Sequence, residues 1–146
     1  MRIFLFLCLC FGLPLSVLDV NLALAADLRV QVNSVQSRHG VMRFALYNRA
    51  SGFPTHEGRF AYLDVPVAET GSVVAVFTDL APGAYAVAAY HDENGNGEFD
   101  QGFLGLPLEG YGFSRDASSF LSAPSFSSAA VFLEEGGKTI RIRLSY

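Results

Sequence analysis

The stretch that decides the fold is residues 79–100, DLAPGAYAVAAYHDENGNGEFD. Its first five residues, 79–83, predict a tight turn, because proline fixes φ and glycine can adopt a positive φ. Residues 85–90 then place Tyr, Val and Ala on one side of an extended chain and Ala, Ala and Tyr on the other. This two-residue period predicts a β-strand, which runs directly into an acidic, glycine-rich loop from Asp92 to Asp100.

The same alternation of apolar and polar residues recurs on both sides of this stretch. It predicts six further strands, in residues 28–33, 42–47, 60–67, 73–77, 128–133 and 139–146. No window shows a sustained helical period with caps. About seven short strands joined by turns predict an all-β fold, an antiparallel β-sandwich of the immunoglobulin-like type.

The first 25 residues have the order of features of a secretory signal peptide. A basic start at Arg2 precedes an apolar stretch over residues 3–18, and Ala23 and Ala25 supply the small residues of a cleavage site. The alternative is an N-terminal membrane anchor, but the apolar stretch is short for a span of ~20 residues. We therefore expect an exported protein, periplasmic or extracellular, in which residues 1–25 are removed. Residues 26–146 then form a single β-sandwich domain with no stable membrane span.

Export and charge limit the kinds of partner that the domain can have. Cys8 and Cys10 both lie in the signal peptide, so the mature chain cannot form a disulfide. Cleavage removes one base, Arg2, and one acid, Asp19, so the formal charge stays at −4. Because the chain has no basic cluster, nucleic acid and anionic membrane surfaces are disfavoured as partners. An envelope protein, a glycan or a small ligand is the kind of partner expected.

Oxygen-bearing side chains alternate along the acidic loop. Asp92, Asn94 and Asn96 are spaced two residues apart, a glycine follows, and Asp100 lies eight residues after the first aspartate. Calcium is a hard cation that takes ~6–8 oxygen ligands, and an EF-hand loop supplies them at this spacing, with a backbone carbonyl at its seventh position. That position is Glu98 here. The loop therefore predicts a calcium site.

The match to an EF-hand loop lacks its closing ligand. The twelfth position, which should be a bidentate glutamate, is Phe103, and no helices are predicted on either side. Glu109 is the candidate for the missing ligand, and Glu93 is a weaker one. Two carboxylates and two amides predict a modest affinity, nearer the ~10⁻⁴–10⁻³ M of extracellular modules. The alternative is a simple Asn-Gly turn, which explains residues 94–97 but leaves the two outer aspartates unexplained.

Residues 101–126 form a long connection without strand alternation, and such connections are uncommon in compact domains. Because large apolar side chains should avoid water, we expect this segment to fold back over one end or edge of the sandwich. In the alternative interpretation it covers a small apolar ligand or peptide, and the domain is a carrier. Its large apolar residues are Phe103, Leu104, Leu106, Tyr111, Phe113, Phe120 and Phe126.

Motifs of the common enzyme classes are absent from the sequence. There is no Gly-x-Ser-x-Gly elbow, no His-Glu-x-x-His helix and no phosphate-binding glycine loop. Ser114 has no neighbouring partner that would activate it, and a flexible Asn-Gly loop is a poor frame for acid–base chemistry by Asp92 and Asp100. We therefore expect no enzymatic activity, and a hydrolase is the least favoured alternative.

Several sequence blocks, taken in order, resemble the bacterial family called domain of unknown function 2141. They are DLAPGAY at 79–85, HDENGNG at 91–97, LGLP at 104–107 and EGYGFS at 109–114, followed by AAVF at 129–132. The resemblance covers essentially the whole mature chain. It implies an exported, prealbumin-like (transthyretin-like) β-sandwich without an established activity. It also implies that the segment beginning at Glu109 belongs with the acidic loop.

Overall fold

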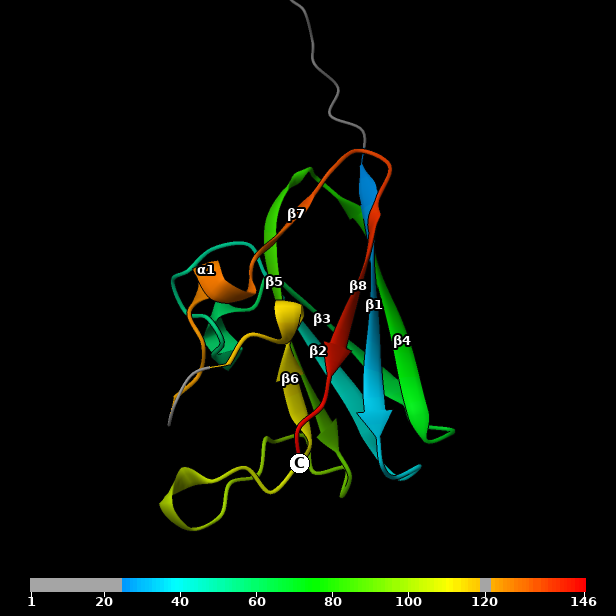
Figure 1. Ribbon diagram of the computed structural model, residues 1–146, viewed down its shortest axis with the longest axis vertical. Helices are drawn as coiled ribbons and strands as arrows, with labels where there is room; N and C mark the ends of the chain where they lie inside the picture. The colour runs from blue at the N-terminus through cyan, green and yellow to red at the C-terminus, as the bar shows by residue number, and fades with distance from the viewer. Residues whose placement is uncertain (1–24, 119–121) are drawn as a thin grey trace, which may run out of the picture.

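The computed structural model describes residues 25–118 and 122–146, which fold as two β-sheets facing each other (Figure 1). This confirms the predicted all-β sandwich, although residues 1–24 of the predicted signal peptide and Phe120 lie outside the described residues. The strands are β1 (Ala26–Val35), β2 (Val41–Tyr47), β3 (Ala61–Pro66), β4 (Gly71–Leu80), β5 (Gly83–Asp92), β6 (Tyr111–Phe113), β7 (Val131–Leu133) and β8 (Lys138–Arg143). The helical turns are η1 (His56–Gly58), η2 (Phe103–Gly105), η3 (Ser114–Asp116) and α1 (Phe126–Ala129). None of the helices in these two ranges is long and apolar enough to cross a membrane.

The first sheet has the strand order β4-β1-β8, and the second has the order β3-β2-β5-β6, with β7 paired to the start of β5. All of these pairs are antiparallel except β1 with β8, which run parallel. Sequence alternation in the last strand correctly indicated one buried face. It could not indicate the direction of the neighbouring strand, because both pairings use the same two-residue period.

The core lies between the inner faces of the two sheets, where alternate residues of each strand are buried. In β1 these are Leu28, Val30 and Val32, all fully buried. In β4, Phe77 pairs with Leu28 and Val73 pairs with Val32. A strand whose apolar set alternates can bury that set on only one face, so this pattern fixes the register. The other sheet contributes Met42, Phe44, Leu46, Tyr85, Val87 and Ala89.

A second apolar layer covers part of the outer side of the second sheet. Tyr47 of β2 meets Phe53 edge to face, with ring centroids 4.9 Å apart, and Phe53 lies 5.9 Å from both Phe113 and Phe126. The last two rings belong to the long connection, residues 101–126. This part of the connection therefore folds back onto the sandwich as expected.

The beginning of the same connection does not fold back, and the prediction is wrong there. Phe103, Leu104, Leu106 and Leu108 are all exposed, the first two by 86% and 82%. Figure 1 shows this segment extending away from the two sheets. Apolar residues avoid water only as a statistical tendency. This hairpin is too short to reach the sandwich, so its apolar side chains have no protein surface to pack against.

Strand β6 was missed because it is only three residues long and has a glycine at its centre. Tyr111 exchanges two backbone hydrogen bonds with Ser145, at 2.9 and 2.8 Å, which joins the C-terminal segment to the edge of the second sheet. At Gly112 a Cβ would lie 2.6 Å from Cγ2 of Ile142 and 2.7 Å from the carbonyl oxygen of Arg143. Glycine is therefore required where the two sheets approach each other.

The helix α1 replaces the first residues of the predicted sixth strand. Ser125 caps it, since its side chain accepts a hydrogen bond from the amide of Ser128 at 3.2 Å. Serine favours such caps over a strand interior, because its hydroxyl satisfies an amide that the helix leaves unpaired. The strand is consequently reduced to Val131–Leu133.

Ser114, in the helical turn η3, is fully buried and connects this turn to strand β5 and to helix α1. Its Oγ accepts a hydrogen bond from the amide of Val87 at 2.9 Å and donates one to the carbonyl oxygen of Ala129 at 2.6 Å. We predict that Ser114→Ala lowers the free energy of unfolding by about 1–3 kcal/mol, because buried backbone groups lose their partner. Urea titration measures this, and the exposed Ser127→Ala is the matched control. Equal stability of both variants would contradict the assigned role.

Candidate functional site

The acidic loop is organised by Asp92, the last residue of β5, whose side chain is fully buried. Oδ1 accepts hydrogen bonds from the amides of Gly95 and Asn96 at 2.7 and 3.1 Å, and Oδ2 accepts one from the amide of Gly97 at 2.9 Å. Both glycines have positive φ, 72° and 87°, which suits glycine and lets the amides turn inward. One carboxylate thus fixes the bend of the loop.

Arg43 of β2 provides the fourth donor to the same carboxylate. Its Nε donates to Oδ2 of Asp92 at 2.8 Å, and its Nη1 donates to Asp64 of β3 at 2.6 Å. Burial alone would raise the pKa of Asp92, but the hydrogen bonds from Arg43 and from the loop amides outweigh it and hold the pKa below its ordinary value. These four donors fill the four acceptor positions of a carboxylate.

Two further predicted residues, Asn94 and Asn96, contact Asp100. The side-chain amide of Asn94 donates to Oδ2 of Asp100 at 2.6 Å, and that of Asn96 donates to both carboxylate oxygens at 3.1 Å. The oxygen of Asn94 accepts the amide of Asn96, and the oxygen of Asn96 accepts the amide of Glu98, both at 2.9 Å. The side chain of Glu98 itself is exposed.

Glu109 also reaches the loop, as the resemblance implied. It is 5% exposed, and its Oε2 accepts the backbone amide of Asp100 at 3.1 Å. Its other oxygen, Oε1, is buried and has no hydrogen-bond partner among the described residues. Burial raises the pKa of Glu109, and the charges of Asp92 and Asp100 raise it further. The structure therefore brings together all six predicted residues, with Glu98 contributing only through its backbone.

Phe99 anchors the loop against the outer side of the second sheet. Its ring lies between those of Tyr90 and Tyr111, with centroid distances of 5.4 and 5.8 Å. The hydroxyl of Tyr90 also donates to the carbonyl oxygen of Gly97 at 3.2 Å. Sequence reasoning missed this contact, although an aromatic residue inside an otherwise polar loop is a signal that it packs against the domain.

Negative charge is left uncompensated at the far side of the loop. In the described part of the chain Arg43 pairs with Asp92 and Asp64, while Asp100 and Glu109 form no ion pair. No group of three or more His, Cys, Asp or Glu side chains in residues 25–118 and 122–146 is arranged to hold a metal ion. A cation here would take amide and carbonyl oxygens as well as carboxylates.

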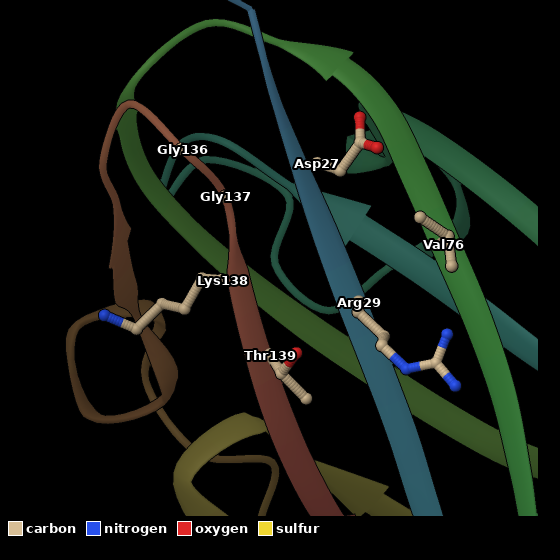
Figure 2. A pocket seen from close by; sticks show the side chains of 7 residues that line it. All are labelled: Asp27, Arg29, Val76, Gly136, Gly137, Lys138 and Thr139. Atoms are coloured by element: carbon tan, nitrogen blue, oxygen red, sulfur yellow. The ribbon is translucent and has the colours of Figure 1, made fainter.

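A separate, shallow hollow lies on the outer side of the first sheet, between β4, β1 and the β7–β8 turn (Figure 2). Arg29 and Lys138 line it, but Figure 2 shows their side chains pointing away from each other. Its remaining lining residues include Asp27, Val76 and Thr139. Because the polar groups do not converge, this hollow lacks the features of a specific ligand site.

The fold and the loop together define a class of protein, a small β-sandwich with an oxygen-rich acidic loop at the end of a central strand. Residues 30–141 match the family described as "Uncharacterized protein conserved in bacteria (DUF2141)". The chain therefore belongs to this family, as the sequence blocks indicated. No curated protein and no solved structure matches the chain.

The two buried carboxyl groups should affect stability in opposite directions. Glu109 keeps its proton longer in the folded protein than in the unfolded chain, so it lowers stability as the pH rises through its unfolded pKa of ~4.3. In calcium-free buffer we expect Glu109→Gln to gain melting temperature relative to the wild type between about pH 4 and pH 7. Glu135→Gln, exposed on the β7–β8 turn, is the control. Parallel pH profiles for wild type and Glu109→Gln would contradict the raised pKa.

Asp92 should stabilise the fold above its unfolded pKa of ~3.9 and lose that contribution as the pH falls through its lower folded pKa. We predict that Asp92→Asn costs about 2 kcal/mol of unfolding free energy at pH 7, because charge-assisted hydrogen bonds to Arg43 and the loop amides are lost. The difference from the wild type should shrink below about pH 3. Urea titration at both pH values measures it, and a constant difference would refute the assignment.

Proposed function

We propose that this protein is an exported binding or interaction module of the bacterial cell envelope, stabilised by one calcium ion in the loop 92–100 and Glu109. The observation that carries the proposal is the buried Oε1 of Glu109, which has no hydrogen-bond partner in the described structure, while Oε2 of the same carboxylate accepts the amide of Asp100. A buried carboxylate oxygen without a hydrogen-bond partner is costly. A bound cation removes that cost and also offsets the repulsion between the two carboxylates.

Calcium suits the donor atoms present better than a transition metal does. All of the candidate donors are oxygens. They are the carboxylates of Asp100 and Glu109, the side-chain amides of Asn94 and Asn96, and the backbone carbonyl of Glu98. Hard oxygen ligands favour calcium or magnesium, and only calcium accepts the irregular geometry of such a loop. In the described structure both asparagines direct their N–H groups at Asp100. Calcium binding requires them to present their oxygens instead, which their exposed positions allow.

The role proposed for Asp92 is mainly to hold the loop. Its four acceptor positions are already filled by Arg43 and three loop amides. It can coordinate an ion only by exchanging one of these donors. We therefore expect Asp100 and Glu109 to account for most of the affinity for calcium.

Export is supported by the signal-peptide pattern of residues 1–25, and a bacterial origin by the family to which the chain belongs. The mature chain contains no cysteine, and small exported domains without disulfides gain stability from a metal or a good core. The carrier alternative has less support, because the hollow lined by residues of the 111–124 segment measures about 170 Å³. Sites for small molecules usually measure ~300–1,000 Å³. A hydrolase has less support still, since Asp92 and Asp100 are both engaged in hydrogen bonds within the loop.

Calorimetric titration of residues 26–146 with CaCl₂ tests the proposal. We expect a dissociation constant near ~10⁻⁴–10⁻³ M, and a melting temperature several degrees higher at ~10 mM calcium than in EGTA. Asp100→Asn and Glu109→Gln should each weaken binding about tenfold or more, because each removes a carboxylate ligand. Glu135→Gln should behave as the wild type. Absence of both heat and a calcium-dependent shift in melting temperature would overturn the proposal.

A further inference from the structure

Residues 101–108, QGFLGLPL, form a hairpin that projects from the end of the sandwich nearest the acidic loop (Figure 1). The hairpin contains no charged residue. Four of its eight residues are large and apolar, and these side chains are exposed by between 58% and 86%. Contiguous exposure of this kind usually marks an interaction surface.

The backbone of the hairpin is paired internally. Gly102 donates to the carbonyl oxygen of Leu106 at 2.8 Å, and Leu108 donates to that of Asp100 at 3.0 Å. The amide of Leu106 also donates to the carbonyl oxygen of Phe103 at 3.5 Å, which closes the turn. The hairpin therefore presents apolar side chains outward while several of its backbone groups are already satisfied within it.

The turn itself uses an unfavourable residue. Leu104 and Gly105 both have positive φ, 61° and 72°, the conformation of a type I′ turn. Asparagine followed by glycine is the pair that suits this turn, and leucine is disfavoured there. A leucine that is both strained and exposed contributes little to folding, so its side chain is better explained by contact with a partner.

The base of the hairpin is formed by two of the proposed calcium ligands. Asp100 precedes the hairpin and Glu109 follows it, and they are joined by the hydrogen bond from the amide of Asp100 to Oε2 of Glu109. An ion bound by both carboxylates would fix the two ends of the hairpin together. It would also neutralise the negative charge immediately behind the apolar tip.

We propose that residues 101–108 insert into the surface of a phospholipid bilayer, and that calcium in the adjacent loop controls this insertion. The inference rests on the proposed calcium site. A bilayer fits the hairpin because apolar side chains with internally paired backbone are what the hydrocarbon boundary requires. A protein partner that adds a β-strand would need unpaired backbone groups on the hairpin, and one that docks a helix would need a groove. Both therefore fit the hairpin less well than a bilayer does.

Charge explains why insertion depends on calcium. Glu98, Asp100 and Glu109 lie at the base of the hairpin and would repel anionic headgroups in the absence of a cation. Bound calcium neutralises the charges of Asp100 and Glu109, and a lipid phosphate oxygen can serve as a further ligand, because calcium takes ~6–8.

Co-sedimentation of residues 26–146 with phosphatidylcholine–phosphatidylglycerol vesicles, in calcium and in EGTA, tests the inference. We expect binding to be about tenfold or more stronger in calcium, and weaker to vesicles of phosphatidylcholine alone. The chain contains no tryptophan, so Phe103→Trp supplies a single reporter, whose emission should shift to shorter wavelength with vesicles and calcium together.

The variant Leu104→Asn separates docking from folding. Asparagine tolerates the positive φ, so the melting temperature and calcium affinity should be kept or raised while vesicle binding falls about tenfold. Phe132→Ser, which removes a 58% exposed ring from β7, is the control and should bind vesicles as the wild type does. Calcium binding without vesicle binding would overturn this inference and leave the calcium site intact. Vesicle binding equal in calcium and EGTA would overturn calcium control, and absence of calcium binding in the titration would overturn the proposed function itself.

Discussion

At the end of β5 a buried carboxylate accepts four N–H donors, and the acidic end of the molecule is arranged around it. Asp92 draws in three consecutive loop amides, which forces the chain to turn back within nine residues and places Asp100 beside Asn94 and Asn96. Arg43 balances its charge from the neighbouring strand. Without this carboxylate the loop amides have no common acceptor, and neither the position of Asp100 nor its contact with Glu109 is defined.

Sequence was informative where the structure depends on local pattern. The alternation in residues 139–146 reports a half-buried surface directly. The tight connection between β4 and β5 at residues 81–82 was also predicted, although the residue with positive φ there is Asp79 and not Gly83. Sequence was uninformative where contacts far along the chain decide. Tyr111–Phe113 becomes a strand because it pairs with β5 and, at Tyr111, with Ser145, and Gly112 is present because Ile142 lies there. The parallel pairing of β8 with β1 is of the same kind.

The candidate site shows the same division. Asp92, Asn94, Asn96 and Asp100 are recognisable together because a nine-residue loop must bring them close. Arg43 lies 49 residues away from Asp92 in sequence, and although it is the one charged residue of β2, its local pattern does not indicate which carboxylate it pairs with. The aromatic content of residues 101–126 predicted burial for the whole segment. Among the described residues of this segment, Phe113 and Phe126 pack on the sandwich while residues 103–106 stay exposed, because an apolar residue can be placed inside or can serve as a contact surface, and composition does not separate the two.

Three features at this end of the molecule are unfavourable for folding alone: the unpartnered oxygen of Glu109, the positive φ of Leu104, and the exposed rings and leucines of residues 103–108. Elsewhere in the described structure the core is apolar and Ser114 is fully hydrogen-bonded, although positive φ also occurs at other non-glycine residues and single exposed rings lie at Phe60, Tyr62 and Phe132. Departures from local consistency that gather in one region are typical of functional sites, because selection there acts on something other than stability. The three departures are also linked physically, since Glu109 ends the hairpin that displays the apolar side chains. A ligand that satisfies the carboxylate therefore acts on the hairpin at the same time.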